Sequence, residues 1–286
     1  MKTFIPLQLL AVFTLAPVAS AQEVITAALA GVPMTDEPDH HLVLNNDYVN
    51  AYDVEVPPHG STRLHQHLHD NVFIVFGNAE VTNAVEGKTP VHLDLKDSSV
   101  NFGRAPYAHK VTNNGTLPFR NIIIELLQSR GDAEKFYSSV DEALASAAGD
   151  ASGIKQNAVL KTDNVRVIAM AVPVGGVWSA PNDDRDRLVV LFDEINDTAN
   201  PKEKNTSFRK GMLVWFGDNK ETGPLTNQLD HLMRLMVLEF RNTSQENPDR
   251  DQTSSPVGAQ YCSSTLQSTT SSFTLPPKFQ PDKQNN

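Results

Sequence analysis

An internal repeat is the feature of this sequence that most restricts its fold. Residues 72–76 resemble residues 188–192 at an offset of 116. Further along, residues 120–125 resemble residues 234–239 at an offset of 114. Because two stretches of about the same length share one pattern, we expect the 286-residue chain to contain two domains built on the same plan.

Each half of the repeat consists of short runs rich in β-branched and aromatic residues, separated by Gly, Pro and Asn. Such runs are typical of strands, and the clearest are residues 52–56, 71–76, 91–95 and 120–126. Neither half contains a long segment with the period of a helix. We therefore predict an all-β fold of two tandem jelly-roll β-barrels, in which paired sheets protect the strand edges.

The segments outside the two halves differ in composition. Residues 132–147 are rich in helix-forming residues and end just before Gly149, so a short helical linker is predicted. Residues 242–286 are rich in Ser, Thr and Pro and poor in large apolar residues. Such a segment buries too little apolar surface to offset its ordering entropy, so a flexible tail is predicted.

The N-terminus has the pattern of a secretory signal peptide. Lys2 precedes an apolar stretch over residues 4–15, and Ala19 and Ala21 are the small residues of an A-x-A cleavage site. The stretch is too short for a permanent membrane anchor. We expect cleavage after Ala21, no membrane span afterwards, and a secreted or periplasmic mature protein.

Charge and cysteine content exclude several classes of function. The chain has 24 Lys and Arg against 34 Asp and Glu, a net charge of −10, so nucleic acid is not an expected partner. Cys262 is the one cysteine, which excludes an intrachain disulfide and a cysteine-based zinc site. A small-molecule ligand or substrate remains as the expected partner, and self-association into a homo-oligomer stays open.

Histidines carry the strongest chemical signal. Four of the nine lie between His59 and His69. His65 and His67 alternate, so on a strand they stand on one face about 6–7 Å apart and can share a cation. His69 has the same parity but lies one pleat repeat further on, as a further or alternative ligand. His109, in a later turn and strand, is the candidate third ligand.

These residues resemble the motifs of the cupin superfamily: a Gly, a His-x-His pair, a hydrophobic strand and a turn Gly, followed later by His-x-x-x-Asn. The matching positions are Gly60, His65, His67, the strand 72–76, Gly77, His109 and Asn113. With the repeat, the chain resembles a bicupin. The expected parts are a signal peptide (1–21), a metal-binding cupin domain (39–128), a linker (129–157), a degenerate, metal-less cupin domain (158–241) and a flexible tail (242–286).

The first half departs from the cupin pattern at one ligand. Asn71 stands where the family usually has a Glu. The site therefore resembles the three-histidine centres of some cupin dioxygenases more than those of oxalate-handling bicupins. Asn71 or His69 can complete the ligand set, and Asn71 and Tyr107 are the candidates to orient a substrate.

The second half has lost every candidate ligand but one. The repeat places Pro181, Asp183 and Arg187 at the positions of His65, His67 and Asn71, and Gly223 opposite His109. Pro and Gly offer no donor atom, and a carboxylate beside a guanidinium favours an ion pair over a cation. One divalent ion per chain is therefore expected, as Fe, Mn, Zn, Ni or Cu.

Two functions follow from the resemblance. The first is an exported mononuclear metalloenzyme, dioxygenase-like or isomerase-like and thus a candidate oxidoreductase, acting on a small oxygen-rich molecule. The second is a non-catalytic module that binds a small molecule or sugar and holds a structural metal. An open coordination position would distinguish the enzyme from the module.

Overall fold

The computed structural model describes residues 30–129, 131–183, 185–196, 207–217 and 223–241. The predicted signal peptide and the predicted tail lie outside these residues. In chain order the elements are β1 (Val32–Pro33), η1 (Met34–Asp36), β2 (His40–Asn45), β3 (Val49–Val56), β4 (His65–His67), β5 (Asn71–Phe76), β6 (Ala79–Val85), β7 (Val91–Leu95), β8 (Val100–Gly103), β9 (Tyr107–Asn113), β10 (Phe119–Leu126), β11 (Glu134–Lys135), α2 (Val140–Ala145), β12 (Lys155–Lys161), β13 (Val165–Val172), β14 (Val177–Trp178), β15 (Arg187–Leu191), β16 (Ile195–Asn196), β17 (Ser207–Phe208), β18 (Leu213–Phe216), β19 (Leu225–Thr226) and β20 (Met233–Phe240). The all-β prediction is confirmed.

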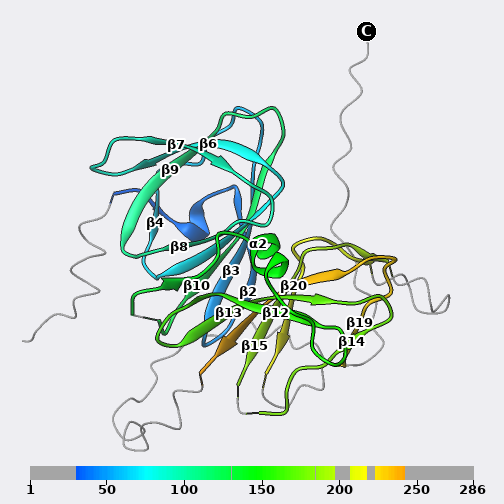
Figure 1. Cartoon of the computed structure of the whole chain (residues 1–286). Coiled ribbons are helices and arrows are strands. Elements are labelled where there is room, and N and C mark those ends of the chain that lie inside the picture. The colour runs from blue at the N-terminus through cyan, green and yellow to red at the C-terminus, as the bar shows by residue number, and fades with distance from the viewer. Residues whose placement is uncertain (1–29, 130, 184, 197–206, 218–222, 242–286) are drawn as a thin grey trace, which may run out of the picture. The chain divides into compact units, whose positions relative to one another are not determined.

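The first half folds into two five-stranded sheets (Figure 1). Sheet I has the order β1-β4-β9-β6-β7, and sheet II has the order β2-β3-β10-β5-β8. Strands far apart in the sequence are neighbours in both sheets, as in a jelly roll. The described strands of the two sheets share no ladder, so they form two separate sheets instead of one closed barrel.

Sheet II is buried on both faces. Along β10, Ile122 and Ile124 belong to one apolar cluster, whereas Phe119 and Ile123 belong to another. A strand with two buried faces reads as a continuous apolar run instead of an alternating one, which explains the apolar runs 72–76 in β5 and 122–124 in β10.

The second half contains one six-stranded sheet, sheet III, with the order β11-β12-β13-β20-β15-β18. One face of sheet III shares an apolar cluster with sheet II, through contacts such as the rings of Phe76 and Phe192 at 5.4 Å. The other face carries a separate cluster that includes Met170, Trp178 and Leu235. The two remaining pairs are β14-β19 and β16-β17.

The same hydrogen bonds recur in the two halves at the offsets of the repeat. Asn113 Nδ2 donates to the Val56 carbonyl, and Asn227 Nδ2 donates to the Val172 carbonyl. The backbone N–H of Asn113 donates to the Gly60 carbonyl at 2.9 Å, just as Asn227 donates to Gly176 at 2.9 Å. The Asn of the His-x-x-x-Asn motif is therefore a structural residue that closes a turn.

The helix predicted over residues 132–147 is too long. Only α2 is helical, and it begins where Ser139 Oγ caps the N–H of Glu142 at 3.1 Å. Upstream, β11 pairs with β12, which begins inside the predicted linker. Composition favoured a helix here, but backbone pairing with the second sheet satisfies the same donors and acceptors.

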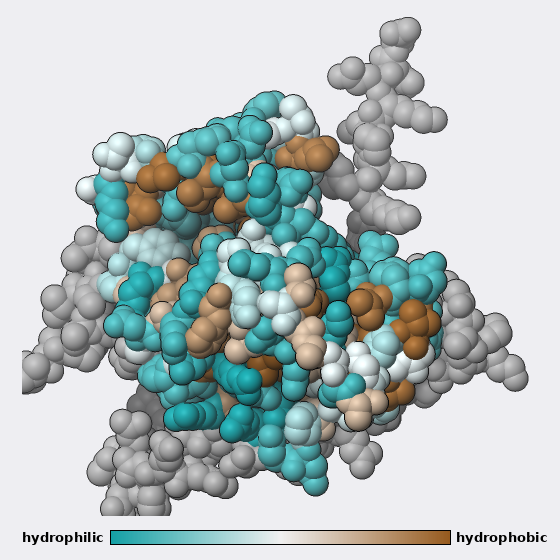
Figure 2. Space-filling model, viewed as in Figure 1, coloured by the Kyte–Doolittle hydropathy of each residue, from teal (hydrophilic) through white to brown (hydrophobic). Residues whose placement is uncertain are grey.

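The visible face of the molecule is mainly hydrophilic, with apolar groups over β6 and β7 and over β14 and β19 (Figure 2). Val91 on β7 and Val177 on β14 are among the exposed large apolar residues. Within the described residues, no helix has the length and apolar character to cross a membrane.

Candidate metal centre

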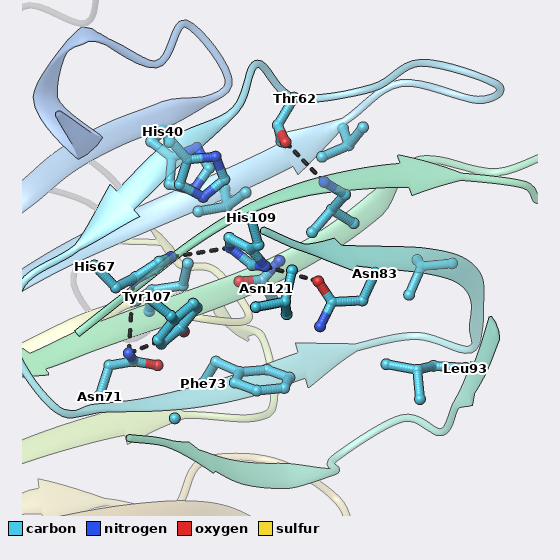
Figure 3. A pocket seen from close by; sticks show the side chains of 18 of the residues that line it. His40, Thr62, His67, Asn71, Phe73, Asn83, Leu93, Tyr107, His109 and Asn121 are labelled. Carbon is cyan, nitrogen blue, oxygen red and sulfur yellow. Dashed lines mark hydrogen bonds between the residues drawn. The ribbon is translucent and has the colours of Figure 1, made fainter. Parts of the chain in front are cut away.

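Three histidines converge where β4 and β9 pair. His65 and His67 alternate along β4, and the antiparallel register places His109 opposite His65. One ring nitrogen of each lies within 4.8 Å of the others. Figure 3 shows His67 and His109 pointing toward one another. The structure thus brings together the three predicted ligands, which we call the three-histidine site.

Hydrogen bonds determine which ring nitrogens face this site. His65 Nδ1 lies 3.0 Å from the Arg63 carbonyl, and His109 Nδ1 lies 2.8 Å from Asn83 Oδ1. Both partners are acceptors, so each ring donates through Nδ1 and keeps a lone pair on Nε2. His65 Nε2 is buried without a hydrogen-bond partner, and His67 Nε2 lies 3.0 Å from His109 Nε2. Nitrogens bound to one ion at about 2.0–2.1 Å can lie this close, so the donor set fits a divalent metal.

Burial keeps these imidazoles neutral. Burial and the nearby His65 ring lower the pKa of His109 to about 3. Burial and the neighbouring imidazoles hold the pKa of His67 well below 6.5, and burial lowers the pKa of His65 as well. Neutral imidazole is the form that binds a metal. A dication bound here would keep its full charge and attract anionic oxygen groups.

Asn71 and Tyr107 lie beside His67. The Tyr107 ring stacks on the His67 ring, with centroids 4.6 Å apart and planes at 15°. Asn71 Nδ2 donates to the Tyr107 hydroxyl at 3.1 Å and lies 3.5 Å from His67 Nδ1. A Cβ at Gly103 would come within 2.7 Å of Asn71 Oδ1, so only glycine at this position leaves room for the side chain of Asn71. The pair is placed to orient the His67 ring.

His69 lies in the bend after β4, outside the three-histidine site. Its carbonyl accepts a hydrogen bond of 3.4 Å from Asn71 Nδ2. The chain turns away from the β4 direction at this point, so the parity that relates His65 and His67 does not extend to His69.

His40 is a fourth buried imidazole that the sequence pattern did not reveal. It begins β2, and its ring centroid lies 4.6 Å from that of His65. Burial and the neighbouring imidazoles lower its pKa to about 3. The histidine next to it in the sequence is His41, so His40 is not part of a His-x-His pattern that would have drawn attention to it. Asn83, which holds His109, was also missed, because no sequence signal connects the two residues.

A cavity of about 400 Å³ adjoins the three-histidine site. Its walls come from sheets I and II (Figure 3). They are mainly apolar, with Val54, Val56, Phe73, Leu93, Leu95 and Phe119 among the lining residues. Amide side chains interrupt these walls at Asn71, Asn83 and Asn121. Its size and lining suit a small molecule with few polar groups.

The corresponding positions of the second half form an ion-pair network. Arg187 donates to both carboxylate oxygens of Asp183, at 2.8 and 2.6 Å, and to Glu239 at 3.2 Å. Asp183 and Arg187 are the counterparts of His67 and Asn71. The expected ion pair is therefore present, and among the described residues the three-histidine site is the one group of three suited to hold a metal.

Neither a protein family model nor a curated protein matches this sequence. The structure is similar to a salicylate 1,2-dioxygenase from Pseudaminobacter salicylatoxidans, with a TM-score of 0.51 at 12% identity over 72% of this chain and 77% of that one. A variant of that enzyme in complex with gentisate gives a TM-score of 0.50 at 13% identity over 78% and 79%. A cupin 2 conserved barrel domain protein from Leptotrichia buccalis gives 0.45 at 12% identity over 76% and 94%. Similarity at these identities concerns the fold alone, and the fold of this chain resembles that of the dioxygenase.

Proposed function

We propose that this protein is an exported mononuclear metalloenzyme of cupin fold that acts on a small oxygen-rich molecule. His65, His67 and His109 would hold one divalent metal. The single observation that supports this proposal is the convergence of three neutral imidazoles beside a cavity, with His65 Nε2 buried and unpartnered. The buried lone pair of His65 costs free energy unless a cation or a donor meets it.

The chain's own residues define what the site can do. A bound divalent metal would supply Lewis-acid polarisation of an oxygen ligand. Asn83 and the Arg63 carbonyl orient two of the imidazoles, and Tyr107 and Asn71 orient the third. The cavity beside them has mainly apolar walls on which the body of a substrate would pack. A dioxygenase-like or isomerase-like reaction is compatible with this arrangement.

Metal analysis of untagged protein tests the proposal. We expect about one divalent ion per chain in the wild type, and a loss of at least tenfold in occupancy in His65→Ala, His67→Ala and His109→Ala. His92→Ala is the matched control, because His92 is an exposed histidine on β7. Equal occupancy in His67→Ala and His92→Ala would contradict the metal site. Oxygen uptake by the loaded protein, with candidate substrates, then tests the dioxygenase-like reaction.

A non-catalytic binding module is the second candidate, and one observation favours it. The described residues that line the cavity include no Asp or Glu to act as a general acid or base. Water exchange at the bound metal distinguishes the candidates, because a catalytic site keeps an exchangeable position and a structural site is closed.

A further inference from the structure

Buried polar atoms without partners concentrate at the cavity. Among the described residues, five buried side-chain atoms have no hydrogen-bond partner, namely His40 Nδ1, His65 Nε2, Asn71 Oδ1, Asn101 Nδ2 and Asn121 Oδ1. Four of the five belong to residues that line the cavity. Native interiors leave few polar groups unsatisfied. The proposed metal accounts for His65, and Asn71 is engaged through its amide nitrogen, which leaves His40 and Asn121.

His40 and Asn121 lie in one row across sheet II. His40 pairs with Val54 on β3, and Val54 pairs with Asn121 on β10. Residues directly opposite one another share a face, so all three side chains face the cavity. The two polar residues are 6% and 3% exposed, and Val54 lies between them. Figure 3 shows both among the cavity-lining side chains.

The equivalent row of the second half contains apolar residues in place of these polar ones. The repeat places Leu235 at the position of Asn121 and Met170 at the position of Val54, and these two also pair across strands. Both are buried in the apolar cluster on that face of sheet III. The same strand position thus tolerates a leucine that needs no partner, so the buried amide of Asn121 is not required by the fold.

We propose that His40 and Asn121 are specificity-determining residues that bind hydroxyl groups of a compact, mainly apolar acid in the cavity. This inference rests on the proposed function, because the acid group would face the metal held by the three-histidine site. The body of the ligand would pack on Val54, Phe73 and Leu93.

Binding of three related acids to the cobalt(II)-loaded full-length protein tests the inference. The probes are cyclohexanecarboxylate and its 3-hydroxy and 4-hydroxy derivatives, with affinities from calorimetry and metal contact from the cobalt absorption spectrum. We expect at least one hydroxy acid to bind the wild type about tenfold more tightly than the parent acid. Asn121→Leu and His40→Phe should each abolish the gain from a hydroxyl while leaving the affinity for the parent acid unchanged.

Asn101→Leu is the matched control, because it removes another unpartnered buried amide nitrogen from a residue that does not line the cavity. It should keep the hydroxyl gain. Asn121→Ala and His40→Ala replace the first variants where those do not fold. The inference is overturned if no probe binds the wild type, if a hydroxyl adds no affinity, or if the variants keep its gain. Failure of the proposed function is distinct, since the wild type would then lack a cobalt spectrum that His67→Ala removes.

Discussion

At the scale of single residues, the three-histidine site depends on the groups that orient its rings. His109 is held by Asn83 at 2.8 Å, and His65 by a backbone carbonyl at 3.0 Å. These contacts select the tautomer that presents Nε2 to a cation. Substitution of a histidine ligand and substitution of the residue that orients it should therefore both weaken metal binding, the first more strongly than the second.

The substitution Asn83→Ala should weaken metal binding by about 10–100-fold without abolishing it, because His109 loses the acceptor that orients its ring. Competition with a chelator measures the affinity. Asn114→Ala is the control, since Asn114 bonds Thr82 and His92 on the same sheet, away from the three histidines. An affinity that is the same in both variants would show that the Asn83 contact has no role in metal binding.

In the second half, the repeat places the buried Arg187 at the position of Asn71. We expect Arg187 to contribute to stability and not to metal binding. Its side chain is 2% exposed and its partner Glu239 is 11% exposed. The substitution Arg187→Met should lower the free energy of unfolding by about 2 kcal/mol, because Glu239 loses its buried partner and keeps only the more exposed Arg166 and Arg185. Urea unfolding measures this change. Metal occupancy should stay at the wild-type value, and an occupancy that falls with Arg187→Met would contradict the separation of the two halves by function.

At the scale of elements, sheet II is the centre of the described structure. One face lines the cavity, and the other packs on sheet III through a shared apolar cluster. Ion pairs add to the contact between the two halves, with Lys210 Nζ at 2.8 Å from Asp97, which precedes β8, and Arg234 at 2.9 Å from Asp141 on α2. The two sheets should therefore unfold together.

The Asp97–Lys210 pair gives a pH dependence of stability. Burial alone would raise the pKa of Asp97, but hydrogen bonds from Lys210 and the Gly77 N–H outweigh it and hold this pKa below its usual value of 3.8. A carboxyl whose pKa is lowered by folding stabilises the protein above the unfolded pKa, and this contribution is lost as pH falls through the folded pKa.

The substitution Asp97→Asn should therefore destabilise the protein at pH 6 and have progressively less effect below pH 4. Urea midpoints between pH 2.5 and 7 measure the difference. Asp94→Asn serves as the control, because Asp94 is an exposed residue of β7. A destabilisation by Asp97→Asn that stays constant over the whole range would contradict the assignment.

At the scale of the whole molecule, the two halves differ in how the faces of their sheets are filled. The first half keeps a cavity between two sheets, whereas the equivalent face of sheet III is filled by its own apolar side chains. We expect one tightly bound divalent metal per chain, and none in the second half. Plasma mass spectrometry with protein quantification gives the ratio. Two equivalent tight sites per chain would contradict the division.

The proposal of export belongs to the same scale. We expect the mature chain to begin at Gln22, because Ala19 and Ala21 supply the small residues that signal peptidase requires. N-terminal sequencing of protein recovered from the periplasm or medium tests this expectation. A secreted chain that still begins at Met1 would contradict it.

Features that repeat at short or fixed intervals could be predicted from the sequence alone. The strands 71–76 and 91–95 agree in their bounds with β5 and β7, because runs of β-branched and aromatic residues and the turn residues that bound them act locally. The position of His65 and His67 on one face of β4 could be predicted because side chains alternate along a strand. The ion pair of Asp183 with Arg187 followed from the repeat offset and from charge.

Which distant residues meet at the site could not be predicted from the sequence, because it depends on how the strands pair and the sheets pack. The cavity receives side chains from three strands of two sheets, namely His40, Asn83 and Asn121. Their contacts depend on strand register and on sheet packing, so no regular spacing in the sequence connects them. The short α2 and the added strand β11 were decided in the same way, since backbone pairing with β12 competes with local helix propensity. Local patterns report local geometry, whereas a cavity is formed by side chains that only the packing of sheets brings together.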